Sequence, residues 1–278
     1  YGAGLYADRS ALLTVRNCVI RDNQATDSGG GLHISGSAGA TVANSIIAAH
    51  QAGSDGGGID ITAVTATLAG NRIHGNTAVR NGAGISLRGS SQATVTGNTV
   101  STNAAGARAG GMSVADGSVG HAANSIFWHN SAPGPTELCV LDGCSLDVGH
   151  CDVSGGPGVV HVEPAAQFTW LVGNIDADPL FLDSNGPDDD PATWEDNDLR
   201  LAAHSPCIDA GDNAAVPADT PDLDADGDKL EPWPLDLGNR PRFLDRTVVP
   251  DRGAGTPPIV DIGADEFWDT VRTDFRAV

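Results

Sequence analysis

Aliphatic and polar residues alternate in short stretches that recur along the first 130 residues, each stretch behind a run of glycine. Every repeat begins with a glycine followed by an aliphatic residue, and an asparagine follows later in the same repeat. The glycine-aliphatic pairs are Gly4-Leu5, Gly31-Leu32, Gly58-Ile59, Gly84-Ile85 and Gly111-Met112, and the asparagines are Asn17, Asn44, Asn71, Asn98 and Asn124. Both series advance by about 27 residues, which is typical of one solenoid coil.

The alternation within each repeat predicts three short strands. The first follows the glycines, as in residues 32–35 (Leu-His-Ile-Ser), and its successive side chains face opposite sides. A second strand is marked by Val15, Val42, Leu68 and Val95, and a third by the residues two positions after the asparagines: Val19, Ile46, Ile73, Val100 and Ile126. We therefore predict an all-β fold, a parallel β-helix whose asparagines occupy tight corners and hydrogen-bond from coil to coil.

Two sequence resemblances extend this prediction. The asparagine pattern followed by Gly-Gly-Gly-Ile resembles the right-handed parallel β-helix proteins of the pectate-lyase-like superfold. Residues 174–181 (NIDADPLF), 198–201 (DLRL), 205–212 (SPCIDAGD) and 260–267 (VDIGADEF) look like the C-terminal region of secreted bacterial proteins called choice-of-anchor Q proteins. The resemblance implies a right-handed β-helix in an extracellular or cell-surface location, and it implies little about activity.

Charge divides the chain into two parts. The 278 residues carry a formal net charge of −21, yet residues 1–130 contain six acidic residues against seven arginines, and residues 131–278 contain thirty against eight basic ones. We expect regular coils at 1–130 and, continuous with them, the last coils and an acidic cap at 131–278. This acidity argues against a nucleic-acid partner, and without a run of about 18 apolar residues we expect no membrane-spanning segment.

The acidic part contains a candidate metal-binding loop at residues 222–228 (DLDADGD). Alternating carboxylates with a glycine after the third resemble the first half of a calcium loop. An EF-hand would place its last glutamate at Trp233, so further ligands must come from Asp228, from backbone carbonyls, or from Asp219 or Glu231. We predict calcium as the cofactor, with Asp222, Asp224, Asp226 and Asp228 as ligands, and a solvated acidic loop as the alternative. The acidic run at 185–198 leaves the same two possibilities open.

The cysteines predict a disulfide in an exported protein. Cys139, Cys144 and Cys151 lie close together in the sequence, and Cys207 lies apart from them. A Cys139–Cys144 bond is the simplest pairing, with Cys151 or Cys207 joined elsewhere. A zinc site that adds His150 is the alternative, although its spacing matches no standard zinc pattern.

A row of outward side chains on the first strand is the main candidate for binding. If the aliphatic residues of that strand face inward, one outward column contains Tyr6, His33, Asp60, Ser86 and Ser113, with Asp8, Ser35, Thr62, Arg88 and Ala115 beside it. His33, Asp60 and Arg88 then occupy consecutive rungs about 4.8 Å apart and could contact a linear polymer. A solvated sheet face is the alternative.

Catalytic signals are weak. The only lysine, Lys229, lies in the acidic loop, so a lysine-dependent lyase on the repeat face is excluded, and Arg88 or Arg108 remain as bases without a supporting motif. Aromatic residues make up 5% of the chain, and Trp194 and Trp233 are the ones we expect to reach a ligand.

These signals favour a non-catalytic, calcium-stabilised module that binds polysaccharide or another extracellular glycan through Tyr6, His33, Asp60, Arg88, Trp194 and Trp233. One alternative is a polysaccharide lyase or glycoside hydrolase acting on acidic glycan. Another is a structural adhesin or fibre-forming protein that associates end to end, because the chain starts within a repeat and leaves a strand edge at Tyr1. The same start leads us to expect further coils or a signal upstream.

Overall fold

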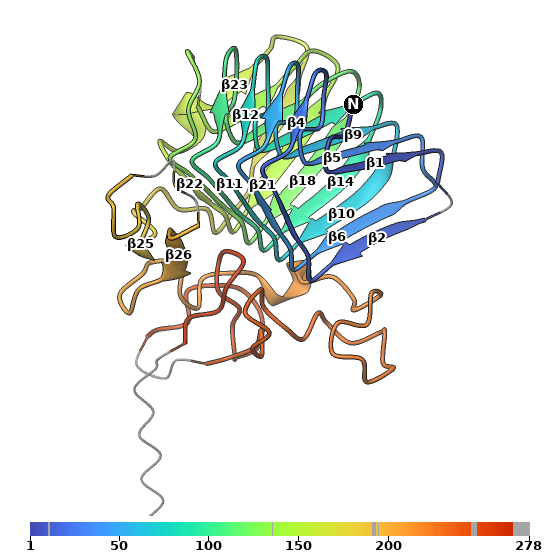
Figure 1. Ribbon diagram of the computed structural model, residues 1–278. Coiled ribbons are helices and arrows are strands. Elements are labelled where there is room, and N and C mark those ends of the chain that lie inside the picture. The colour runs from blue at the N-terminus through green and yellow to red at the C-terminus, as the bar shows by residue number, and fades with distance from the viewer. Residues whose placement is uncertain (11, 135, 191–192, 194, 246–248, 269–278) are drawn as a thin grey trace, which may run out of the picture.

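A parallel β-solenoid forms the body of the protein (Figure 1). The computed structural model describes residues 1–10, 12–134, 136–190, 193, 195–245 and 249–268. Leu5 pairs with Leu32, and Leu32 pairs with Ile59, so equivalent residues are separated by one coil of about 27 residues. The predicted all-β parallel β-helix is confirmed.

Three long sheets run along the solenoid, one for each predicted strand. The first sheet contains β1 (Leu5–Asp8), β5 (Leu32–Ser35), β9 (Ile59–Thr62), β13 (Ile85–Arg88), β17 (Met112–Val114), β20 (Leu138–Val140) and β23 (His161–Val162). The second contains β2 (Leu13–Arg16), β6 (Ala40–Ala43), β10 (Thr65–Ala69), β14 (Gln92–Thr96), β18 (Val119–Ala123), β21 (Ser145–Gly149) and β24 (Gln167–Trp170). The third contains β3 (Val19–Arg21), β7 (Ile46–Ala48), β11 (Arg72–His74), β15 (Thr99–Ser101), β19 (Ile126–Trp128) and β22 (Asp152–Val153).

A fourth sheet, which the sequence pattern did not predict, consists of two-residue strands. Its members are β4 (Gln24–Ala25), β8 (Gln51–Ala52), β12 (Thr77–Ala78) and β16 (Ala104–Ala105). These strands are too short to show a period of two in the sequence, so they escape a search based on alternation.

The solenoid core confirms the predicted inward residues of the first two strands and corrects the third. Val15, Val42, Leu68 and Val95 form a buried stack in register. In the third sheet the stack contains Ile20, Ile47, Ile73, Val100 and Phe127. Val19, Ile46 and Ile126 lie on the third strands as predicted, but taking them as the inward residues is wrong by one position. A slip of one residue reverses the face of a strand, and Val19 is accordingly 61% exposed.

The error arose because the five asparagines occupy two adjacent positions of the coil. Asn17, Asn44 and Asn124 lie at a corner with positive φ, where the other coils have Gly70 and Gly97. Asn71 and Asn98 lie one position later and form a buried ladder: the backbone N–H of Asn71 donates to Asn98 Oδ1 at 3.0 Å. A second buried ladder runs through Asn76, Asn103 and Asn130. The asparagines are structural, as predicted, but some occupy the left-handed corner and others form the buried ladder.

The chain beyond residue 170 runs back along one side of the solenoid, where the orange and red segments lie below the coils in Figure 1. We call the described residues among 171–268 the lateral segment; they contain β25 (Phe181–Asp183), β26 (Asp198–Leu201), the 3-10 turn η2 (Asn213–Ala215) and little other regular structure. Another 3-10 turn, η1 (Pro157–Val159), precedes it. We expected a cap on the last coils, whereas the lateral segment reaches the first coil through Arg16, which donates to the backbone carbonyls of Pro221 and Asp222.

The corner between the second and third sheets holds the lateral segment. Asn44 Nδ2 donates to the carbonyl oxygens of Leu235 and Asp236 at 3.1 and 3.0 Å, and Asn124 Nδ2 donates to that of Asp212 at 2.8 Å. Thr96 Oγ1 donates to Ala215 O at 3.0 Å. The left-handed corner asparagines therefore join the two parts of the molecule.

Candidate functional site

The predicted outward row on the first sheet exists. Tyr6, His33, Asp60, Ser86 and Ser113 occupy paired positions on consecutive strands. His33 Nδ1 lies 2.8 Å from Asp60 Oδ2, and Arg88 donates through Nε and Nη2 to the two oxygens of Asp60, each at 2.8 Å. The three side chains that we singled out therefore form one polar cluster across three coils.

This cluster is buried, so it presents little surface to a ligand. Asp60 is fully buried and His33 is 4% exposed. A Cβ at Gly29 would lie 2.7 Å from the Cβ of His33, and one at Gly56 would lie 2.7 Å from that of Asp60. The glycine run that precedes each first strand thus passes directly over the row. A ligand on this face would reach Tyr6, which stacks on His33 at 5.3 Å, and the partly exposed Arg88.

The electrostatics of the cluster favour a fixed carboxylate. Burial raises the pKa of the Asp60 carboxyl, but hydrogen bonds from His33 and Arg88 outweigh burial, and the pKa lies below its ordinary value. Burial acts to lower the pKa of Arg88, and the pair with Asp60 outweighs this and raises it. Asp60 is a poor proton acceptor and Arg88 a poor base.

The two tryptophans predicted to meet a ligand do not form a site with this row. Trp233 is 3% exposed and packs with Leu223 against Ala43 and Ala69, so the prediction that it is exposed was wrong. It lines a cavity of only about 10 Å³, which is too small for a sugar. Trp194 lies outside the described residues.

A groove of about 360 Å³ lies over the fourth sheet, on β4, β8 and β12. Gln24, Gln51 and Thr77 line it as one paired row with their side chains exposed. Thr26, Gly53 and Val79 line the other side, and Ala25, Ala52 and Ala78 lie between the two rows. Sequence analysis missed this groove, but the recurring dipeptides Gln-Ala, Gln-Ala, Thr-Ala and Ala-Ala at intervals of about 27 residues could have revealed it.

The acidic loop brings carboxylates together in two groups that share Asp224. In one group, oxygens of Asp222, Asp224 and Asp226 lie within 4.8 Å of one another; in the other, so do oxygens of Asp219, Asp224 and Glu231. Asp228 joins neither group, and its Oδ1 accepts from Leu230 N at 2.9 Å. Of the residues suggested by the motif, Asp219 and Glu231 therefore lie close to Asp224, and Asp228 belongs to neither group.

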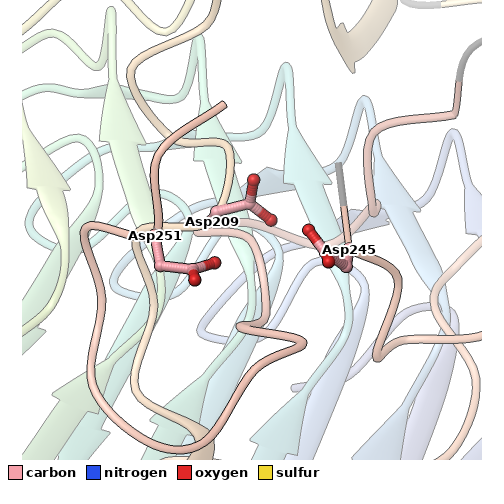
Figure 2. Close-up of side chains that lie close together, drawn as sticks. All are labelled: Asp209, Asp245 and Asp251. Atoms are coloured by element: carbon pink, nitrogen blue, oxygen red, sulfur yellow. The ribbon is translucent and has the colours of Figure 1, made fainter. Parts of the chain in front are cut away.

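A third carboxylate group consists of Asp209, Asp245 and Asp251, whose side chains point toward a common space in Figure 2. Our sequence analysis did not propose it, because Asp209 lies 36 residues before Asp245 in the chain. Asp245 and Asp251 are exposed, and exposed carboxylates are readily screened by solvent, so we assign no ion to this group. In the run at 185–198, Asp198 pairs with Arg200 and no metal-binding group occurs among the described residues.

The cysteines are free thiols, which corrects the predicted disulfide. Leu138 and Val140 lie in the solenoid core, so Cys139 between them faces the opposite side of β20, whereas Cys144 and Cys151 lie inside the core. Cys139 cannot reach Cys144 across the strand. Because Cys139 faces away from the core that contains Cys144 and Cys151, the three cysteines of the alternative zinc site do not converge on one point either.

Comparison with protein families agrees with this geometry. The model described as the right handed beta helix region matches residues 2–167. The chain belongs to this family. The match ends before residues 174–181, where the resemblance to choice-of-anchor Q proteins begins, so that finer resemblance stays a prediction. No curated protein and no solved structure matches this β-helix chain.

Proposed function

We propose that this β-helix is a non-catalytic module that binds a linear, uncharged polysaccharide in the groove over the fourth sheet, outside the cell or at its surface. The observation that carries the proposal is the chemistry of the groove. Its lining consists of glutamine, threonine, alanine, glycine and valine, without an ionisable side chain. General acid-base catalysis requires such side chains within hydrogen-bond reach of the substrate, so the groove is suited to binding and not to turnover.

The row of Gln24, Gln51 and Thr77 is suited to sugars. Each side chain both donates and accepts hydrogen bonds, as sugar hydroxyls do, and successive coils repeat this capacity every 4.8 Å or so. The opposite wall of the groove is small and apolar at Gly53 and Val79, which leaves room for the C–H face of a pyranose ring. The lack of charge in the lining favours a neutral polymer over a uronic acid polymer.

The competing enzyme function has less support. A lyase or hydrolase acting on acidic glycan would use the row of His33, Asp60 and Arg88, but Asp60 is buried and bonded to both partners. A hydrolase needs two carboxyl groups that flank the scissile bond, and this cluster supplies one. We therefore place ligand binding in the groove over the fourth sheet.

Retention on immobilised linear glycans, neutral and acidic, tests the proposal. Removing one neutral hydrogen bond is worth about 1 kcal/mol, so Gln51→Ala should weaken binding to a neutral glycan about 5-fold. Gln92→Ala removes an exposed glutamine from β14, outside the groove, and serves as the matched control with unchanged binding. Retention of no neutral glycan would overturn the proposal, as would an equal loss in the two variants. Release of shortened products would indicate an enzyme.

A further inference from the structure

We propose that the loop of residues 219–231 binds Ca²⁺ through Asp219, Asp224 and Glu231, with Asp222 and Asp226 beside them, and that the bound ion holds the lateral segment against the first coils. This site is separate from the groove over the fourth sheet, so glycan binding can fail while the calcium site stands. The proposal rests on carboxylate positions, on two buried oxygens and on the contacts of the loop with the solenoid.

The carboxylate positions suit a large, oxygen-preferring cation. Oxygens on opposite sides of a bound Ca²⁺ are about 4.8 Å apart, since each Ca–O distance is about 2.4 Å, and the Asp219, Asp224 and Glu231 oxygens all lie within 4.8 Å of one another. Asp222 and Asp226 form the second group around the same Asp224. The ion would therefore take Asp219, Asp224 and Glu231 as its carboxylate ligands, while Asp222 and Asp226 lie beside it around the shared Asp224.

Buried oxygens without partners provide the independent indication of a ligand. Asp219 is fully buried; its Oδ2 accepts from Leu223 N at 2.8 Å, but its Oδ1 has no hydrogen-bond partner among the described residues. Glu231 Oε1 is also buried and lacks a partner within that part of the chain. A buried carboxylate oxygen is costly unless it is hydrogen-bonded or coordinated to a metal. Asp219 belongs to the group with Asp224 and Glu231, where a bound cation would satisfy its free oxygen.

Electrostatic repulsion between the carboxylates of the loop also favours a bound cation. Residues 219–231 contain six carboxylates and a single basic residue, Lys229. A divalent cation would relieve this repulsion.

The loop is closed at its base and attached to the solenoid. Asp219 N donates to Glu231 O at 2.8 Å, and Trp233 N donates to Pro217 O at 2.9 Å. Arg16 of the first coil donates to backbone carbonyls within the loop, and Leu223 and Trp233 pack against Ala43 and Ala69. An ion that orders the loop therefore also holds Trp233 in its buried position.

Calcium titration of the full chain, after chelation and dialysis into buffered KCl, tests the site. Heat of binding gives the affinity, and Tb³⁺ luminescence sensitised by tryptophan that is lost in Trp233→Phe reports occupancy close to that indole. We expect saturable Ca²⁺ binding, a higher melting temperature and a blue shift of tryptophan emission. Asp224→Asn should lower the affinity at least 10-fold, whereas Asp228→Asn, an equal change of charge outside both groups, should lower it less than 3-fold.

Several outcomes would overturn the site. One is the absence of saturable Ca²⁺ binding by the wild type. The others are equal losses of affinity in Asp224→Asn and Asp228→Asn, and equal competition by Mg²⁺ at the same concentration, because either would indicate diffuse attraction of cations to an acidic surface. Circular dichroism of each variant in the chelated state establishes that the chain is folded. Asp219→Asn provides a second variant, which should weaken binding because a neutral amide replaces the buried carboxylate.

Discussion

The solenoid and the lateral segment are held together by different kinds of contact. In the solenoid each coil repeats the contacts of its neighbour, through stacked aliphatic residues and buried asparagine ladders. The lateral segment has two short strands and is anchored by individual polar contacts, such as Asn44 with Leu235 and Asn124 with Asp212. The same chain therefore combines a part with redundant stability and a part that depends on single residues.

This difference predicts that the two parts open separately. Local stability follows the density of buried apolar contacts. The largest apolar cluster lies inside the coils, whereas the clusters joining the lateral segment to the coils are smaller, as with Leu223 and Trp233 on Ala43 and Ala69. We expect amide hydrogen exchange of the lateral segment to exceed that of the coils, and each mutation below changes one side of this comparison.

The described residues contain no helix that could span a membrane.

The largest effect should come from the solenoid core. Leu87 on β13 is fully buried between the coils, so Leu87→Ala leaves a cavity and should cost about 3 kcal/mol of unfolding free energy. Because the lateral segment opens separately, its exchange should accelerate less than that of the coils. Chemical denaturation measures the loss. Leu182→Ala, at a 52% exposed position on β25, is the matched control and should change stability by less than about 0.5 kcal/mol. Equal effects of the two changes would contradict the comparison.

The solenoid was predictable from the sequence because its information is local and repeated. Leu32 and Ile34 face inward by alternation, and each coil offers an independent copy of that evidence. The third strand was located, but its inward positions were off by one where the asparagine landmark itself shifted by one position, as between Asn44 and Asn71. A sequence repeat thus predicts the architecture well. It predicts which strand residues face inward only if the residue used to align the coils keeps the same position in each of them.

The lateral segment was not predictable in the same way. Asn44 and Leu235 are 191 residues apart, and nothing in either local sequence indicates that they meet. The motif at 222–228 did identify Asp222, Asp224 and Asp226, because those carboxylates are neighbours in the chain. Asp219 and Glu231 could be named only as options, because backbone pairing at the base of the loop determines which distant carboxylate approaches.

The next effect concerns an ion pair that joins the two parts. Arg72 on β11 donates through Nη2 to Asp265 Oδ2 at 2.7 Å, and both side chains are largely buried. Arg72→Ala leaves the Asp265 carboxylate poorly compensated, and we expect a loss of about 2 kcal/mol, below the range for fully buried pairs. Hydrogen exchange should increase in the lateral segment and remain unchanged in β13. A double-mutant cycle with Asp265→Ala measures the coupling, and a coupling near zero would show that this pair does not anchor the segment.

The smallest effect concerns the end of an asparagine ladder in the solenoid. Asn130 donates through Nδ2 to Glu137 Oε2 at 2.5 Å and through its backbone N–H to Oε1 at 3.2 Å. Burial raises the pKa of Glu137 to about 8, despite these hydrogen bonds. The folded state therefore prefers the protonated carboxyl, and the resulting stability is present below the ordinary pKa of 4.5 and is lost as pH rises through about 8.

Glu137→Gln replaces this carboxyl with a neutral amide that can continue the ladder. We expect little change at pH 4 and higher stability than the wild type at pH 8, because the wild-type carboxyl loses the proton that its folded state prefers between those pH values. Denaturation at both pH values measures the difference, and Glu137→Ala, which leaves the Asn130 amide without its acceptor, should be destabilised at both. If Glu137→Gln loses stability at pH 8, the carboxylate itself completes the ladder, and the repeat then depends on a charged terminus as the lateral segment depends on Asp265.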